Sequence, residues 1–188
     1  MQLKSFQIRE LQEAVALERS ETAYKVLFVQ LYQSAISFTT TITKNEEVAE
    51  ELYADAMMKL WFMESKLTDI KDLKLYIFIL LKNSALNYLK KERKQRFVSI
   101  DDIDRGDVPQ TRSVEESLVF NELENMLAQV IDKLPSKCQI VYKLIKHEGF
   151  SYKHTAEILG LSVNTIEGHM SNALKKIGTF LKSLNLKD

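Results

Sequence analysis

Apolar residues recur every three or four positions along most of this chain, which is the spacing of one helix face. Polar and β-branched residues interrupt that spacing at Thr39–Thr41 and again at Met63–Asp72. The pattern predicts helices over Ile8–Leu17, Glu21–Thr43, from the N-cap Asn45 to Met63, Leu73–Lys94, Leu118–Lys133 and Ser136–Glu148, followed by two more after Ser151. Five glycines and two prolines are few for the length and also favour helices over hairpins.

One segment, 97–117, breaks the helical pattern. It is rich in acids, has little apolar content, and contains Gly106 and Pro109, which is typical of a flexible linker. The sequence therefore predicts an all-α protein with two helical domains, 1–96 and 118–188, joined by an acidic flexible linker.

The stretch Ser151–Ile177 has the spacing of a helix-turn-helix. Ser151 and Ser162 stand where N-caps belong, and Gly160 can take the left-handed conformation of the turn. Ala156 leaves room for a close helix crossing, and Ile166 fills the space between the helices. The second helix is expected to bury the stripe Val163, Ile166, Met170, Leu174, Ile177 and Leu181. Its other faces carry short polar residues first and lysines later, which suits a major groove and its phosphates.

The formal net charge is zero, but the charge is unevenly distributed. Residues 71–96 hold eight basic and two acidic groups, and residues 126–188 hold nine and five. Residues 97–125 hold two basic and eight acidic groups. Two basic blocks separated by an acidic one indicate two polyanion-binding surfaces.

Catalytic and metal-binding motifs are not found. The single cysteine, Cys138, excludes an internal disulfide and fits a reducing cytoplasm. The longest apolar run, Leu75–Leu81, is far shorter than a membrane helix requires, so no direct membrane insertion is expected. The three histidines are not paired at metal-binding spacing. We predict a non-enzyme in the cytoplasm with no catalytic residue, cofactor or metal.

Three stretches resemble bacterial RNA polymerase sigma factors of the extracytoplasmic-function (ECF) subfamily, in the order that family has. AEELYADAMMKLW (49–61) is similar to the helix that grips the polymerase clamp, and YIFILLKNSALNYLKK (76–91) to the promoter-melting helix. LPSKCQIVYKLIKHEGFSYKHTAEILGLSVNTIEGHMSNALKKI (134–177) is similar to the reader of the upstream promoter element. The resemblance implies a protein that binds core RNA polymerase and directs promoter-specific initiation at −10 and −35 elements, assisting promoter melting.

Carried onto this sequence, the resemblance implies three sets of site residues. Core polymerase would contact Glu51, Asp55 and Met58. The −10 element would be handled by Asn83, Asn87, Tyr88 and Lys91, with a flipped base entering a pocket near the loop 63–72. The −35 element would meet Asn164, Thr165, Glu167, His169, Ser171 and Lys175, with Lys176 also at phosphate.

Several positions depart from the common pattern of the family. Met57 stands where Phe is frequent, Ala54 where Gln is, Ile79 where Arg is, and Asn87 where Asp is. The second helix of the helix-turn-helix lacks the basic residues usual near 167, 169 and 172. These departures lower the expected phosphate affinity and suit a protein that binds DNA as part of a polymerase complex.

Three alternatives to the sigma factor remain open from the residues alone. They are a helical hairpin that packs on another element, a helix-turn-helix regulator with a ligand-binding or dimerising first domain, and a helical scaffold. The family resemblance also implies an anti-sigma partner, but no residue here identifies it. The promoter sequence, the inducing signal and the free protein's oligomeric state are equally invisible in the sequence.

Overall fold

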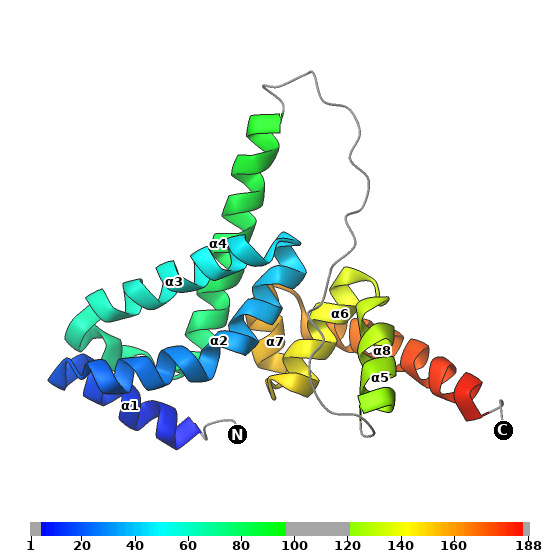
Figure 1. Ribbon diagram of the computed structural model, residues 1–188, viewed down its shortest axis with the longest axis horizontal. Coiled ribbons are helices and arrows are strands. Elements are labelled where there is room, and N and C mark those ends of the chain that lie inside the picture. Colours follow the sequence, from blue (N-terminus) through cyan, green and yellow to red (C-terminus); the bar gives the residue numbers. More distant parts are fainter. Residues whose placement is uncertain (1–4, 97–120, 186–188) are drawn as a thin grey trace.

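The computed structural model describes residues 5–96 and 121–185, and every regular element within them is helical (Figure 1). The first part comprises α1 (Ser5–Glu18), α2 (Glu21–Thr43), α3 (Glu46–Met63), the 3₁₀ helix η1 (Glu64–Asp69) and α4 (Leu73–Arg96). The second comprises α5 (Asn121–Asp132), α6 (Ser136–Tyr142), the π-helical turn η2 (Lys143–His147), α7 (Tyr152–Leu159) and α8 (Val163–Asn185). The predicted all-α class is confirmed. The predicted linker, 97–117, lies outside the described residues.

Three helices of the first part begin at a side chain that caps the helix, of which only Asn45 was predicted from the sequence. Ser20 accepts from the Ala23 amide at 3.2 Å, and Asn45 accepts from the Val48 amide at 3.1 Å. Asp72 does the same for α4 through the Leu75 amide at 2.9 Å. Each side chain satisfies one of the amides that a helix start leaves without a partner.

The core of the first part lies between α2, α3 and α4. Its largest fully buried side chains include Leu27, Tyr53, Met57, Leu60 and Ile77. Tyr53 reaches across to α2, where its hydroxyl donates to the Phe28 carbonyl at 2.7 Å. Burial raises the pKa of Tyr53 well above its usual value, because the phenolate would lose its hydration.

The predicted helix Glu21–Thr43 is confirmed as α2, whereas the helix predicted over α6 differs from the structure. α2 continues undisturbed through its threonines to Thr43, because Thr41 and Thr43 donate their hydroxyls to carbonyls one turn back at 2.8 and 3.2 Å. The helix expected over Ser136–Glu148 changes hydrogen-bonding pattern at Lys143 and ends with a π turn.

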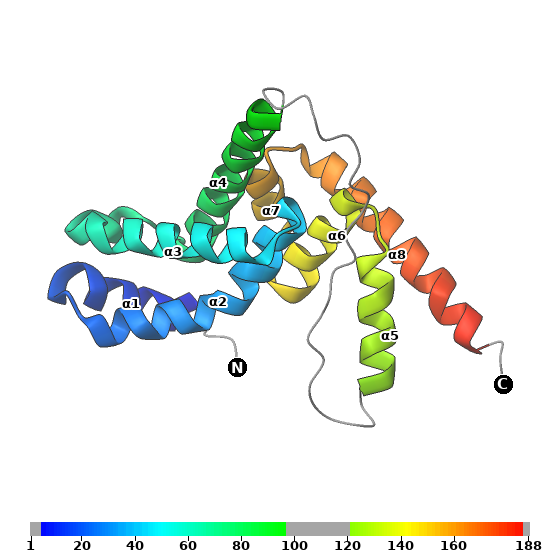
Figure 2. The same cartoon turned by 45° about the horizontal axis from the view of Figure 1, so that its top comes forward.

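The second part packs α8 against α5, α6 and α7 (Figure 2). Val130, Ile131 and Leu134 meet Ala173 and Ile177 in one small core. Val141 and Ala156 meet Ile166 and Met170 in another. α8 therefore buries Ile166, Met170, Ala173 and Ile177, at steps of four, three and four residues. The predicted stripe was wrong at Val163, Leu174 and Leu181, which are exposed because they lie at the edge of the face that α5 to α7 cover.

Candidate functional site

One exposed stripe runs along α3. Glu51 and Asp55 are exposed, and Met58 follows with 53% of its surface exposed. Phe62, which the sequence reasoning missed, continues the stripe and is 68% exposed. The steps of four, three and four residues put all four side chains on one helix face. An acidic half and an apolar half on the same face suit a partner helix with basic and apolar residues.

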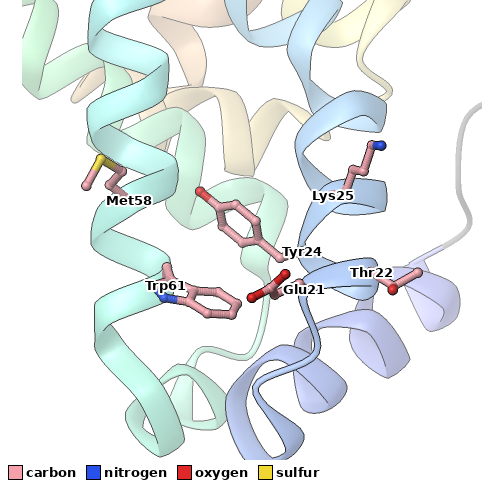
Figure 3. Close-up of a pocket in the computed structure, with 6 residues that line it drawn as sticks. All are labelled: Glu21, Thr22, Tyr24, Lys25, Met58 and Trp61. Atoms are coloured by element: carbon pink, nitrogen blue, oxygen red, sulfur yellow. The ribbon is translucent and has the colours of Figure 1, made fainter.

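A pocket of about 750 Å³ lies beside this stripe, between α2 and α3 (Figure 3). The Tyr24 and Trp61 rings meet there edge to face, with centroids 5.1 Å apart. Arg19 also contacts Trp61, with its guanidinium carbon 4.0 Å from the ring centroid and Nη1 donating to the Trp61 carbonyl at 2.6 Å. Burial also raises the pKa of Tyr24, so its hydroxyl remains a neutral donor. The Tyr24–Trp61 pair therefore gives the pocket an aromatic wall.

α4 presents a second exposed face. Asn83, Asn87 and Lys91 are all exposed, as are Lys90 and Lys94. Tyr88 is only partly exposed and points to a different side, because it lies 100° around the helix from Asn87. Leu86, 42% exposed, adds an apolar side chain beside the amides that sequence reasoning did not single out. An exposed leucine among amides and lysines is the kind of side chain that can wedge between bases.

Two aromatic residues at the start of α4 belong to the packed interior and not to this exposed face. Phe78 is fully buried and cannot stack on a base, while Tyr76 is partly buried against Met63. Core packing explains both rings better than nucleic-acid contact does.

The loop before α4 is held by α1. The predicted polar connection forms η1, and Gln12 donates to the carbonyls of Leu67 and Ile70 at 2.6 and 2.8 Å. Arg9 donates to the carbonyls of Thr68 and Ile70, both at 3.1 Å. Four hydrogen bonds from one helix give this loop a fixed shape, which a pocket for a flipped base requires.

The helix-turn-helix has the geometry predicted for it. Ser151 caps α7 through the His154 amide at 3.0 Å, and Ser162 caps α8 through the Thr165 amide at 3.2 Å. Gly160 occupies the left-handed region at φ +67°. Ala156 and Ile166 are buried where the helices cross. Local capping and one glycine therefore account for this motif.

The candidate reading face of α8 is exposed along most of its length. The predicted contact residues that are exposed are Asn164, Thr165, Glu167, Ser171 and Lys175. Thr165 is already engaged, because its hydroxyl lies 2.8 Å from that of Ser162. His169 lies apart from this face: it is partly buried, with Nδ1 3.9 Å from the Cys138 sulfur on α6. The structure thus brings five of the six residues onto the exposed side and turns His169 toward the neighbouring helix.

Other kinds of site find no support in the described ranges. No three His, Cys, Asp or Glu side chains in 5–96 and 121–185 gather closely enough to hold a metal ion. Over the same residues, no helix combines the length and apolarity that crossing a membrane would need.

The described residues thus form a helical protein with a candidate partner-binding face on α3 and two candidate nucleic-acid faces, on α4 and α8. Family models for sigma-70 region 2 and sigma-70 region 4 match residues 27–95 and 124–177. The chain belongs to the sigma-70 family. Its membership of the ECF subfamily stays a prediction from the sequence. We refer to the two matched parts as region 2 and region 4.

Solved structures of two other proteins share this fold. One is the sigma factor RpoE in complex with the anti-sigma factor NepR from Bartonella quintana, with 23% identity and a TM-score of 0.63 over 85% of this chain and 96% of that one. The other is CnrH in complex with the cytosolic domain of CnrY, with 19% identity and a TM-score of 0.57 over 94% and 98%. No curated protein matches this chain.

Family membership decides among the alternatives left open by the sequence. The protein is a sigma factor: it binds core RNA polymerase and promoter DNA and directs transcription initiation. Sigma factors are non-catalytic initiation factors. A match to region 2 leaves no place for a ligand-binding regulator domain or an inert scaffold.

Proposed function

We propose that this sigma factor has two domains, 1–96 and 118–188. Each of the three exposed helix faces, on α3, α4 and α8, binds a different part of the polymerase–promoter complex. α3 grips the polymerase clamp through Glu51, Asp55 and Met58. α4 handles the −10 element through Asn83, Asn87 and Lys91, with Tyr88 at the flank and the loop 63–72 receiving a flipped base. α8 reads the −35 element.

The observation that carries the −10 assignment is the exposed face of α4. Two amides, a leucine and three lysines share a region of α4 in which Asn83 and Asn87 are exposed. Amides read base edges, lysines meet phosphates, and an apolar side chain unstacks bases. This combination suits melting, where unpaired bases must be held against the cost of opening the duplex.

At the −35 element, Asn164, Glu167 and Ser171 would face the major groove and Lys175 a phosphate, with Thr165 at the helix start. His169 remains in the proposal as a residue near the groove. Its side chain would have to turn away from Cys138 to contact the DNA. The small number of basic residues predicts weak binding by region 4 alone. Polymerase must then supply the rest of the promoter affinity.

Two further assignments belong to the same proposal. The neighbours bound to an anti-sigma factor or to CnrY support a protein inhibitor for this chain as well. A protein that serves RNA polymerase works in the cytoplasm, and polymerase performs the chemistry, so the chain needs no catalytic residue or cofactor.

Run-off transcription with bacterial core polymerase on genomic promoter fragments tests the −10 assignment. Asn83→Ala combined with Asn87→Ala should reduce transcription at least about tenfold, since each lost base contact costs about 1 kcal/mol or more. The matched control is Gln30→Ala with Gln33→Ala, which removes two exposed amides from α2.

A template opened beforehand around the −10 element separates melting from recognition. Transcription by the double variant should recover on this template when melting is the lost step. Equal transcription by wild type, variant and control on duplex templates would refute the assignment.

A further inference from the structure

The loop between α3 and α4 has a backbone conformation that its own sequence does not favour. η1 is a 3₁₀ helix of six residues, whereas runs of this helix longer than three or four residues are uncommon. Glu64, at its start, has φ +52°, in the left-handed region that favours glycine. Residues 64–72 contain no glycine or proline that would favour such a turn. A strained backbone of this kind persists only where contacts from outside the loop stabilise it.

α1 supplies these contacts. Three backbone carbonyls of the loop accept four hydrogen bonds from two side chains of α1. Gln12 Nε2 donates to Leu67 at 2.6 Å and to Ile70 at 2.8 Å. Arg9 Nη1 donates to Thr68 and to Ile70, both at 3.1 Å. Because each donor joins two carbonyls, the pair fixes the curvature of the loop backbone.

The groups on the inner side of the loop are themselves held in place. Gln12 is only 1% exposed, and a buried amide is costly unless its donors are bonded. Arg9 donates through Nε to Glu13 at 2.7 Å, one turn further along α1, which orients its guanidinium group. Leu67, also 1% exposed, anchors the middle of the loop in the core of region 2. One apolar anchor and two polar bridges therefore hold the loop.

The outer side of the loop carries polar side chains. Ser65, Lys66 and Asp69 are all exposed. Their hydroxyl, ammonium and carboxylate groups can form hydrogen bonds with a base edge. Such contacts discriminate between bases only when the groups are held within a fraction of an ångström of the productive position. That position follows from the loop backbone, and the backbone is held by Arg9 and Gln12.

We propose that Arg9 and Gln12 are positioning residues that set the shape of the loop 63–72 and thereby determine which base it accepts at one position of the −10 element. The inference rests on the proposed role of that loop. Neither side chain has to contact DNA. Base discrimination at this position is therefore controlled from α1, which precedes the residues matched by the region 2 family model, 27–95.

Hydrogen–deuterium exchange of the free chain tests the support of the loop without polymerase or DNA. Arg9→Met combined with Gln12→Leu removes all four hydrogen bonds while keeping side chains of similar size. Exchange of the amides in 64–72 should become at least about tenfold faster, because opening the loop no longer breaks these bonds. The control is Tyr53→Phe, which removes a buried hydrogen bond to α2 and none to the loop, and should leave exchange there unchanged.

Arg9→Met alone keeps the test available where Gln12→Leu prevents folding. The Arg9 side chain is 41% exposed, so its replacement leaves the core unchanged, yet it removes two of the four bonds. Exchange in 64–72 should still become faster. Arg9→Lys keeps one donor and should give a smaller increase than Arg9→Met.

Run-off transcription with core polymerase measures which bases are accepted. The templates derive from a promoter fragment on which the unchanged chain initiates, with all four bases present at each position of the −10 element. The unchanged chain should favour one base at the flipped position at least about fivefold, the lower end of the cost of one wrong base. The double variant should reduce this ratio below about twofold and leave the base preferences at the −35 element unchanged. Arg9→Lys should retain more of the ratio than Arg9→Met.

A merely structural role predicts a different result. The transcript yield would then fall equally for all four bases, as expected for Tyr53→Phe, and this result would overturn the positioning role. Unchanged exchange of the loop amides in the double variant would overturn it as well.

Ser65→Ala combined with Asp69→Ala separates this inference from the proposed function, because it changes exposed loop side chains and no bond to α1. If only this variant loses the base preference, the inference is overturned and the proposed role of the loop is supported. If every variant keeps the preference, the inference is overturned and the loop is not part of the −10 site.

Discussion

The exposed end of the α3 stripe should contribute measurably to polymerase binding. Phe62 is 68% exposed and lies on the same helix face as Met58. We predict that Phe62→Ala weakens binding of the chain to core polymerase and leaves its fold intact.

The magnitude follows from the exposed area. A phenylalanine offers about 200 Å², so 68% exposure leaves about 135 Å² for a partner to cover. At about 25 cal/mol per Å², complete coverage contributes at most about 3 kcal/mol. Coverage of half that area contributes about 1.7 kcal/mol, which is about fifteen- to twentyfold in Kd.

Fluorescence anisotropy of chain labelled at its N-terminus, titrated with core polymerase, measures this Kd. Leu17→Ala is the matched control, since Leu17 is 65% exposed but lies on α1, outside both the stripe and the α2–α3 pocket. Asp55→Lys, within the stripe, should also weaken binding. If Asp55→Lys weakens polymerase binding but Phe62→Ala leaves the Kd unchanged, the interface extends along α3 only as far as Met58. If the Kd is unchanged for both variants, α3 is not part of the polymerase interface.

Two further predictions concern stability. Above about pH 10 the unfolded chain ionises Tyr53 whereas the folded chain holds it neutral, so the free energy of unfolding should fall as pH rises from there. Tyr53→Phe should cost about 1 kcal/mol at neutral pH through the lost bond to Phe28 but reduce the alkaline loss, as urea titrations at pH 7 to 11 would detect; an identical pH dependence would contradict the assignment. Gly160→Ala should destabilise by about 1 kcal/mol, because its φ of +67° strains any side chain although nothing lies within 4 Å. Gly178→Ala in mid-α8 should stabilise by about as much, and thermal melts with equal signs for the two would refute the argument.

Local features of the fold were predictable from the sequence because their causes are local. Each helix of the helix-turn-helix begins directly after a capping serine, and the turn between them depends on Gly160. The bounds of α2 and the start of α4 likewise follow from capping and apolar spacing. The proposed contact residues Glu51, Asn83 and Ser171 are exposed, as helix periodicity predicted, because the period fixes which side chains share a face.

Features that depend on another helix could not be predicted in the same way. Spacing alone did not show that α5 to α7 bury Ala173 and leave Leu174 exposed. His169 was expected on the DNA face, and only the packed structure turns it toward Cys138. Phe62 could have been found, since it continues the steps that connect Glu51 to Met58, but an aromatic residue at a helix end more often packs inward.

The contact between region 2 and region 4 shows why helix periodicity does not reveal contacts between distant segments of the chain. Lys74 has the sequence context of a solvated lysine at a helix start, and Phe78 that of an ordinary core residue. Lys74 pairs with Glu148, and Phe78 packs against Phe150; both partners are more than seventy positions away in the chain. An ion pair, a ring pair and a lysine–threonine hydrogen bond join segments of the two regions that are far apart in the sequence. The spacing of apolar residues within one helix carries no information about such partners.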